Sequence, residues 1–283
     1  MAYKFIQELL STADATKGTL LIPQKIHDTL IEETEKNLIP RSEAGWVISG
    51  FEGSDYTLNL QTPNTLKLRV IGEGAEGPID EAAYTSTTLT PLKYGVGLRI
   101  TRELLEDAKW NLLEHSIKLI GRRFAENETS LVITALDSAA NTVSGGAAIT
   151  IANITRAIQY LNDNDYKATT MLIGPEVLND LQNIDTFVEA DKLGNREMLE
   201  KGFIGKLYGM NVMLFSANAA PSTTYSKYAY IFDNMHAYAI AEKRPITVEK
   251  FSLPVYDMDA AMATQRITAR AIRTSAIAKI TTS

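Results

Sequence analysis

The glycines between residues 72 and 77 form the most suggestive chemical pattern in the chain, since they match the sequence G-x-G-x-x-G. In dinucleotide-binding proteins this pattern lets a tight turn approach a pyrophosphate at the N-terminus of a helix. Here Pro78 and the β-prone run at 84–88 follow the loop, and Glu73 and Glu76 would repel a phosphate. The pattern is therefore interpreted as the turn of a β-hairpin.

Other candidate sites carry weaker signals. Residues 202–207 lack two spacer residues of a phosphate-binding P-loop, and Leu207 stands where that loop has its magnesium-binding hydroxyl. Residues 162–167 are similar to a calcium loop, but Lys167 would occupy a ligand position. The histidines are scattered, and the chain has no cysteine, which excludes thiolate sites and disulfides. We expect no catalytic residue, no metal and no cofactor.

The one basic concentration lies near the C-terminus. It consists of Arg266, Arg270, Arg273 and Lys279, and the first two are expected on one face of a strand. Two interpretations stay open: ion pairs with neighbouring acids, which we favour, and loose contact with phosphates. The net charge of −6 argues against a dedicated nucleic-acid binder.

The glycine loop needs two strands to hold it. Leu66, Leu68 and Val70 precede the loop, and a return strand follows it with an apolar side and an opposite side of cations and glycines. The apolar side is Tyr94, Val96, Leu98 and Ile100, and the opposite side is Lys93, Gly95, Gly97 and Arg99. The two glycines favour close approach of another backbone.

A long helix is predicted to follow this strand. Thr101 can cap its N-terminus, and an apolar stripe continues to about Ala140. Such a helix is ~60 Å long at 1.5 Å per residue, whereas a compact domain of this length has a radius of gyration of ~19 Å. A lone hairpin is also marginal in water. Both elements are therefore expected to lie against other copies of the chain.

The remaining segments predict a mixture of helices and strands. Amphipathic helices are expected at 6–13 and 23–38, a half-buried strand at 56–60, and a domain boundary at 144–146. Beyond it we expect helices at 154–161 and 175–181, a surface loop at 184–209, and strands at 169–173, 212–214, 228–232, 246–251 and 266–280. The apolar positions change phase near Ile272, which predicts a bulge or a strand that changes sheets. No signal peptide or membrane-spanning run is present.

Several short stretches in a fixed order resemble the major capsid proteins of tailed phages and archaeal tailed viruses, which have the Hong Kong 97 fold. Encapsulin shell proteins share this fold. The stretches are Gly-Thr-Leu-Leu-Ile-Pro at 18–23, Glu-Gly-Ala at 73–75, Thr-Pro-Leu-Lys at 90–93, Ile-Thr-Arg-Glu-Leu-Leu-Glu-Asp at 100–107, Gly-Met-Asn-Val at 209–212, and 237–238 with 244–248. Together the resemblance covers residues 18–283.

The resemblance implies an α+β fold of the Hong Kong 97 type with a defined order of parts. An N-terminal arm would cover residues 1–60 and an extended hairpin, the E-loop, 61–100. The spine helix of a peripheral domain would cover 101–142, an axial domain 143–240, the peripheral sheet 241–272 and a C-terminal strand 273–283.

The resemblance also implies a function. The chain would be a structural, non-enzymatic subunit that forms pentamers and hexamers of an icosahedral virion head around double-stranded DNA, assembled in the host cytoplasm without a membrane. Residues expected to contact neighbouring subunits are Gly72, Glu73, Gly74, Glu76, Gly77, Lys93 and Arg99, and an inner basic face is expected at Arg266, Arg270 and Arg273.

Only about 20 residues precede the matching region, so a separate scaffold protein, or none, is expected, together with a portal and a protease. Two alternatives remain at this point. One is an encapsulin shell that holds a cargo enzyme, and the other is an α/β enzyme that binds a nucleotide at the glycine loop.

Overall fold

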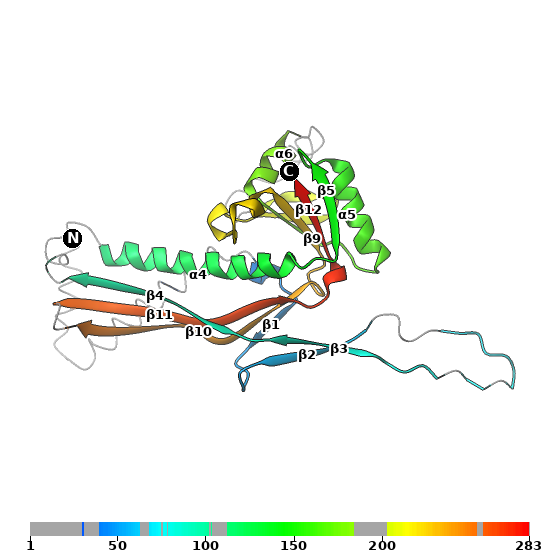
Figure 1. Cartoon of the computed structure of the whole chain (residues 1–283), viewed down its shortest axis with the longest axis horizontal. Coiled ribbons are helices and arrows are strands. Elements are labelled where there is room, and N and C mark those ends of the chain that lie inside the picture. The colour runs from blue at the N-terminus through cyan, green and yellow to red at the C-terminus, as the bar shows by residue number, and fades with distance from the viewer. Residues whose placement is uncertain are drawn as a thin grey trace.

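The computed structural model describes residues 30, 40–62, 68–74, 76–77, 79–101, 103, 112–183, 203–253 and 257–282. Figure 1 shows three parts: an elongated layer of strands beneath one long helix, a compact body at one end of that layer, and a slender hairpin that projects away from both. The molecule has a mixed α+β fold, as the sequence predicts.

The elongated layer is a four-stranded sheet, here called the long sheet, with strand order β1-β10-β11-β4. Its strands are β1 (Trp46–Ser49), β10 (Tyr238–Leu253), β11 (Met258–Ala271) and β4 (Leu92–Thr101). Helix α4 (Leu112–Leu136) lies along one face, where Ile117 and Phe124 pack against Ile246 and Ala263. Leu30 joins the same cluster and is 1% exposed.

The compact body is built on a six-stranded sheet, here called the compact sheet. In spatial order its strands are β5 (Asn141–Gly146), β12 (Ile277–Thr282), β9 (Tyr228–Phe232), β6 (Thr170–Ile173), β8 (Met210–Leu214) and β7 (Phe203–Leu207). Helices α5 (Ile151–Asp163) and α6 (Pro175–Gln182) contribute to a core with this sheet. A second core joins the end of α4 to both sheets, through residues such as Val132, Tyr230 and Ile267.

The projecting hairpin, here called the arm, consists of β2 (Tyr56–Gln61), β3 (Tyr84–Leu89) and the described residues between them. Its root packs on β10 through Leu58 and Leu89, which contact Ala239 and Ala241. The described residues also form short 3-10 helices, namely η1 (Pro40–Glu43), η3 (Ala217–Ala219), η4 (Thr223–Lys227) and η6 (Thr274–Ala276).

Several sequence predictions are confirmed. The helices at 154–161 and 175–181 are α5 and α6, and the strands at 169–173, 212–214 and 228–232 are β6, β8 and β9. The phase change near Ile272 marks the point where the chain leaves the long sheet after β11 and enters the compact sheet as β12. The apolar face changes there because the two sheets present different sides to the core.

Other predictions are wrong. Leu68 and Val70 lie in no strand and are fully exposed, and the return strand β4 pairs with β11 and not with them. Residues 144–146 are the end of β5, which pairs with β12, and the domain boundary expected there stays a prediction. Residues 203–207, expected in a loop, pair with β8 as an edge strand.

The long helix is confirmed only over part of its predicted span. It ends at Leu136, earlier than expected, because Asp137 and Ser138 form a turn, and Thr101 is the last residue of β4. The predicted helix at 6–13, most of the one at 23–38, the strand residue Leu66, positions 104–111 and the loop at 184–202 lie outside the described residues.

Gly174 provides a test of the packing in the compact body. A Cβ at this position would lie 2.1 Å from the carbonyl oxygen of Ser226, a backbone atom that cannot move aside on its own. Gly174→Ala is expected to lower the free energy of unfolding by about 3 kcal/mol, measured by urea denaturation. Gly72→Ala is the control, because a Cβ there meets no atom within 4 Å and should leave stability unchanged.

Candidate assembly surfaces

The far end of the arm exposes apolar side chains that find no cover in the subunit. Leu68 is 104% exposed, Val70 102% and Ile79 92%. Arg69 and Asp80 form an ion pair of 2.9 Å across the arm, and Gly74 turns the chain with φ +77. Exposed leucine, valine and isoleucine gain free energy when they leave water, so this end of the arm is suited to binding another surface.

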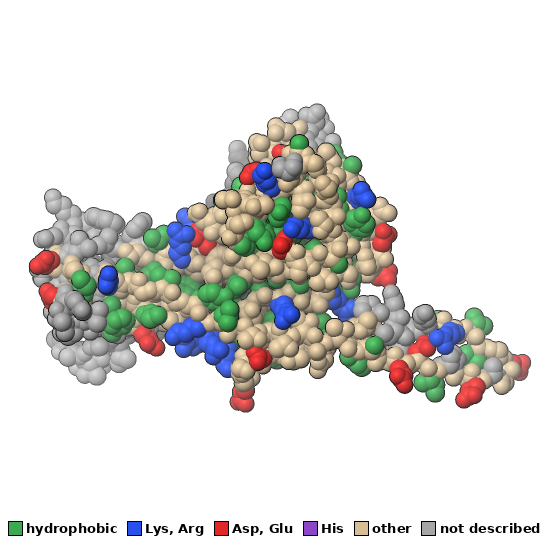
Figure 2. Space-filling view, viewed as in Figure 1, with side chains coloured by type: hydrophobic (Ala, Val, Ile, Leu, Met, Phe, Trp, Pro, Cys, Tyr) green, Lys and Arg blue, Asp and Glu red, His purple; other side chains and the backbone are tan. Residues whose placement is uncertain are grey.

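The same end of the arm is acidic. Glu73, Glu76 and Glu81 are exposed, and Asp80 is partly buried against Arg69. Figure 2 shows acidic and apolar side chains side by side along the projecting arm. A complementary surface should therefore be apolar at its centre and basic at its border.

The face of the long sheet that points away from α4 has this character. Ala263 packs against Phe124 of α4, so its neighbours Met262 and Thr264 point to the other face. In register with these two residues lie Gly97 and Gly95, which place no side chain on this face. Met262 is 39% exposed and Phe251, on β10, is 46% exposed. We call this surface the outer face.

A row of cations crosses the outer face. Arg244 of β10, Arg266 of β11 and Lys93 of β4 are successive partners in the strand register. Like charges directly opposite one another are unfavourable, so a bound acidic group would stabilise the row. Arg99 lies on the same side of β4, as the alternation predicted. Figure 2 shows basic side chains gathered along this side of the sheet.

A buried ion-pair network links the segment before β1 to the helix and the long sheet. Arg41 contacts Glu128 of α4 at 2.6 Å and Glu242 of β10 at 3.0 Å, and Gln265 donates to Glu242 at 2.8 Å. The Glu128 side chain is only 2% exposed. Burial raises the pKa of Glu128, and Arg41 offsets part of that rise. The sequence contains no local signal for this network, because its members are far apart along the chain.

Asp137 forms a second junction, between the end of α4 and the compact sheet. Tyr225 and Tyr230 each donate to its carboxylate at 3.3 Å, and Lys279 contacts it at 2.5 Å. Burial and the charge of Asp137 raise the pKa of Tyr230 above its ordinary value, so the phenol remains a donor. For Lys279 this pairing confirms the favoured ion-pair interpretation of the C-terminal basic group.

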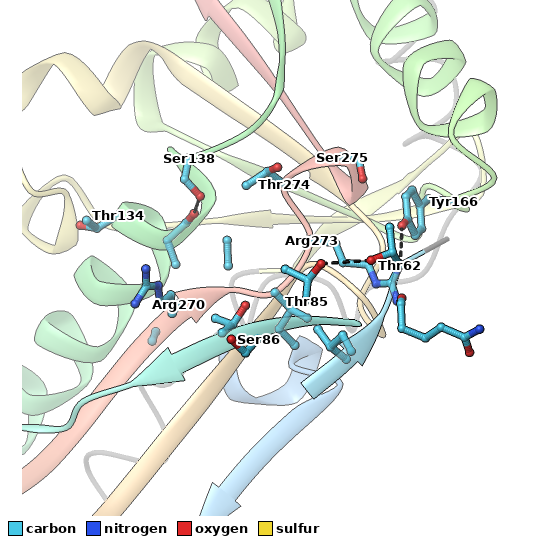
Figure 3. Close-up of a pocket in the computed structure, with 17 residues that line it drawn as sticks. Thr62, Thr85, Ser86, Thr134, Ser138, Tyr166, Arg270, Arg273, Thr274 and Ser275 are labelled. Carbon is cyan, nitrogen blue, oxygen red and sulfur yellow. Dashed lines mark hydrogen bonds between the residues drawn. The ribbon is translucent and has the colours of Figure 1, made fainter. Parts of the chain in front are cut away.

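The other members of that group bind carbonyl oxygens instead of acids. Arg266 donates to Pro91, Arg270 to Thr88 and Arg273 to Gln61, all at the root of the arm. Beside them lies a pocket of about 570 Å³ between the arm, the end of α4 and the bend after β11. Figure 3 shows that hydroxyl groups and the two arginines Arg270 and Arg273 line it. Contact of these arginines with DNA stays a prediction.

The weaker candidate sites lie in ordinary structural elements. The glycine loop is the turn of the arm, and the described residues that follow it, 79–83, form no helix. Residues 203–207 are strand β7, and 162–167 are the end of α5 with its turn. Within the described part of the chain, no group of three or more acids, histidines or cysteines is placed to hold a metal ion. Among the helices described, none is long and apolar enough to span a membrane.

Comparison with solved structures shows the class of fold, which is the Hong Kong 97 type. The structure is similar to that of Microbacterium phage Oxtober96, with a TM-score of 0.64, 13% identity, and coverage of 87% of this chain and 91% of that one. The structure from Mycobacterium phage Che8 matches with a TM-score of 0.64 and 15% identity, over 81% of this chain and 85% of that one. The virus-like particle from Pyrococcus furiosus matches with a TM-score of 0.62 and 12% identity, over 91% of this chain and 98% of that one. No curated protein sequence matches the chain.

Comparison of the sequence with known families shows which family the chain belongs to. Residues 18–282 match the phage capsid family, so the chain belongs to that family and has a structural role in forming a capsid. This result does not favour the encapsulin interpretation. The match also does not favour the interpretation as a nucleotide-binding enzyme, and the described residues 79–83 after the glycine loop form no helix that could hold a pyrophosphate.

Proposed function

We propose that the chain is the major subunit of an icosahedral phage head, that it forms pentamers and hexamers, and that the head encloses double-stranded DNA. In this proposal α4 and the long sheet form the peripheral domain, the compact sheet forms the axial domain, and the arm is the E-loop. The segment that precedes β2 is the N-terminal arm, so that β2 belongs to the E-loop although the sequence placed the boundary at residue 60. A separate scaffold protein or none, a portal, a protease and assembly in the host cytoplasm belong to the same proposal.

One observation carries the proposal for how subunits join. The end of the arm is apolar and acidic, and the outer face is apolar with a row of cations. The arm of one subunit would lie on the outer face of its neighbour, with Glu73 and Glu76 near the neighbour's Lys93 and Arg99. The arm cannot reach this arrangement with its own sheet as the structure stands, since it projects away from it (Figure 1).

The turn residues Gly72, Gly74 and Gly77 have a part in this contact. No atom lies within 4 Å of a Cβ placed at Gly72 or Gly74, and Gly74 has a positive φ. We propose that these glycines let the tip adjust to five-fold and six-fold neighbours, because glycine accepts backbone conformations that other residues resist.

A charge-swap experiment tests the contact. The expressed chain should form discrete particles in negative-stain images and light scattering. The variant Glu73→Lys/Glu76→Lys, and separately Lys93→Glu/Arg99→Glu, should each lower particle yield at least about tenfold, because like charges then meet at the contact. Combining all four changes should restore assembly.

The control is Asp163→Lys, which alters charge on the exposed end of α5 and should leave particle yield unchanged. Unchanged yields in both double variants would overturn the arm-to-sheet contact. A chain that stays monomeric at high concentration would overturn assembly by the subunit alone and would assign particle formation to a separate scaffold protein. Nuclease-protected DNA in particles from an infected host would support the cargo.

A further inference from the structure

The root of the arm is held by three arginines that follow one another along the chain. Arg273 donates to the carbonyl oxygen of Gln61 at 2.8 Å, Arg270 to that of Thr88 at 2.8 Å, and Arg266 to that of Pro91 at 3.3 Å. The acceptors lie at the end of β2, within β3, and in the connection from β3 to β4. Three carbonyl groups at the root of the arm thus each accept a hydrogen bond from a charged side chain.

Arg273 connects the arm to the compact body as well. Its guanidinium donates to the hydroxyl oxygen of Tyr166 at 3.3 Å and to Gln61 at the same time. Tyr166 is 8% exposed and belongs to the core beneath α5 and α6. A guanidinium has several donors in a rigid fork, so it can hold two acceptors in a set relation, which a lysine does less well.

Apolar packing fixes the root at one place, on β10. Leu58 and Leu89 pack there against Ala239 and Ala241, and partly buried aromatic and aliphatic side chains surround them. Behind the root lies the pocket of about 570 Å³. Figure 3 shows Arg270 and Arg273 on two sides of this space, with Thr85 and Ser86 of the arm facing it. The pocket leaves room for the arm to swing toward the body.

We propose that Arg270 and Arg273 are positioning residues that set the direction in which the arm leaves the subunit, and that the arm swings into the root pocket when their bonds open. The consequence for assembly rests on the proposed function. The direction of the arm itself is a property of a single chain and can be measured without particles.

The absence of cysteine makes the measurement direct. Tyr84→Cys at the start of β3, where the side chain is 70% exposed, and Gln159→Cys on the exposed side of α5 provide two spin-label sites, and pulsed electron paramagnetic resonance gives the distribution of distances between them. Labelled chain is mixed with an excess of unlabelled chain, so that distances within one chain dominate even in particles. Hydrogen exchange of the β2 and β3 amides provides a second readout.

The unmodified chain should give one narrow distance distribution. Arg270→Gln/Arg273→Gln should broaden and shift it, and amides in β2 and β3 should exchange roughly tenfold faster. Glutamine keeps part of the side-chain stem, and circular dichroism checks that the variant folds. The single variant Arg270→Lys should keep most of the narrow distribution. The single variant Arg273→Lys should not, because a lysine cannot hold Gln61 and Tyr166 together as well as a guanidinium does. Arg122→Gln, on the exposed side of α4, is the matched control.

The outcomes separate the two proposals. Unchanged distances and exchange in the double variant would overturn the positioning role and leave the assembly proposal intact. A broader distance distribution in the double variant, in a chain that forms no particles, would support the positioning role. The same result would count against the proposed function. A third outcome is that the double variant forms particles in which the label distances are unchanged and the DNA content is reduced. That result would show that the two arginines contact DNA, and it would overturn the positioning role.

Discussion

Replacing Leu68, Val70 and Ile79 together with serine is expected to abolish particle formation while the subunit keeps its stability. These side chains are 92% to 104% exposed, so the isolated subunit loses no packing when they are removed. On a neighbouring subunit each would bury apolar surface worth about 1.5–3 kcal/mol. The loss is repeated at every contact of a shell, so it should exceed what the remaining contacts can offset.

The measurement is particle yield by light scattering and electron microscopy, with urea denaturation of the unassembled chain as the check on folding. Thr57→Ser/Asn59→Ser changes exposed polar residues of β2 on the same arm and is the matched control. Normal particles from the triple serine variant would show that the apolar end of the arm is not an assembly surface. A lower urea midpoint for the triple serine variant would show that these side chains pack within their own subunit.

Replacing Arg41 with methionine is expected to destabilise the subunit by about 3–5 kcal/mol, because it leaves two carboxylates in the interior without their cation. The side chains of Glu128 and Glu242 are 2% and 11% exposed. Glu128→Gln should cost less than Arg41→Met, since it removes a charge that burial already disfavours. Chemical denaturation of the unassembled chain measures both.

Arg122→Ala is the control for the loss of an arginine. It breaks a pair with Glu126 on α4, where the arginine side chain is 53% exposed and Arg123 still pairs with Glu126. Surface pairs of this kind contribute at most about 1 kcal/mol. A cost for Arg41→Met as small as that of Arg122→Ala would contradict a structural role for the buried network.

The same network predicts how stability depends on pH. The pKa of Glu128 is raised in the folded state, so its contribution to stability is fully present below its unfolded pKa and falls as pH rises through the folded value. Without Arg41 the pKa rises further, because the offsetting cation is gone. The deficit of Arg41→Met should therefore be largest at pH 8 and smaller at pH 5, in urea unfolding at both values. An equal loss of unfolding free energy at both pH values would show that the charge of Glu128 is not the cause of the loss.

The sequence by itself determined the local elements and the family. The alternation from Lys93 to Ile100, the helical spacing in α5 and α6, and the change of apolar phase at Ile272 are encoded by neighbours along the chain. Strand and helix periodicities need no distant partner to be recognised. The ordered capsid motifs, read together, also identified the family that the match to residues 18–282 confirms.

Only the tertiary structure decided which segments pair and which side chains meet. Leu68 and Val70 alternate as strand residues do, but none of the described strands pairs with them, whereas β4 pairs with β11. Arg266, Arg270 and Arg273 looked like a basic face by composition, and the fold brings them to carbonyl oxygens at the root of the arm. Such contacts join residues far apart in the chain, and they form only when the sheets assemble, so no pattern within a short window can specify them.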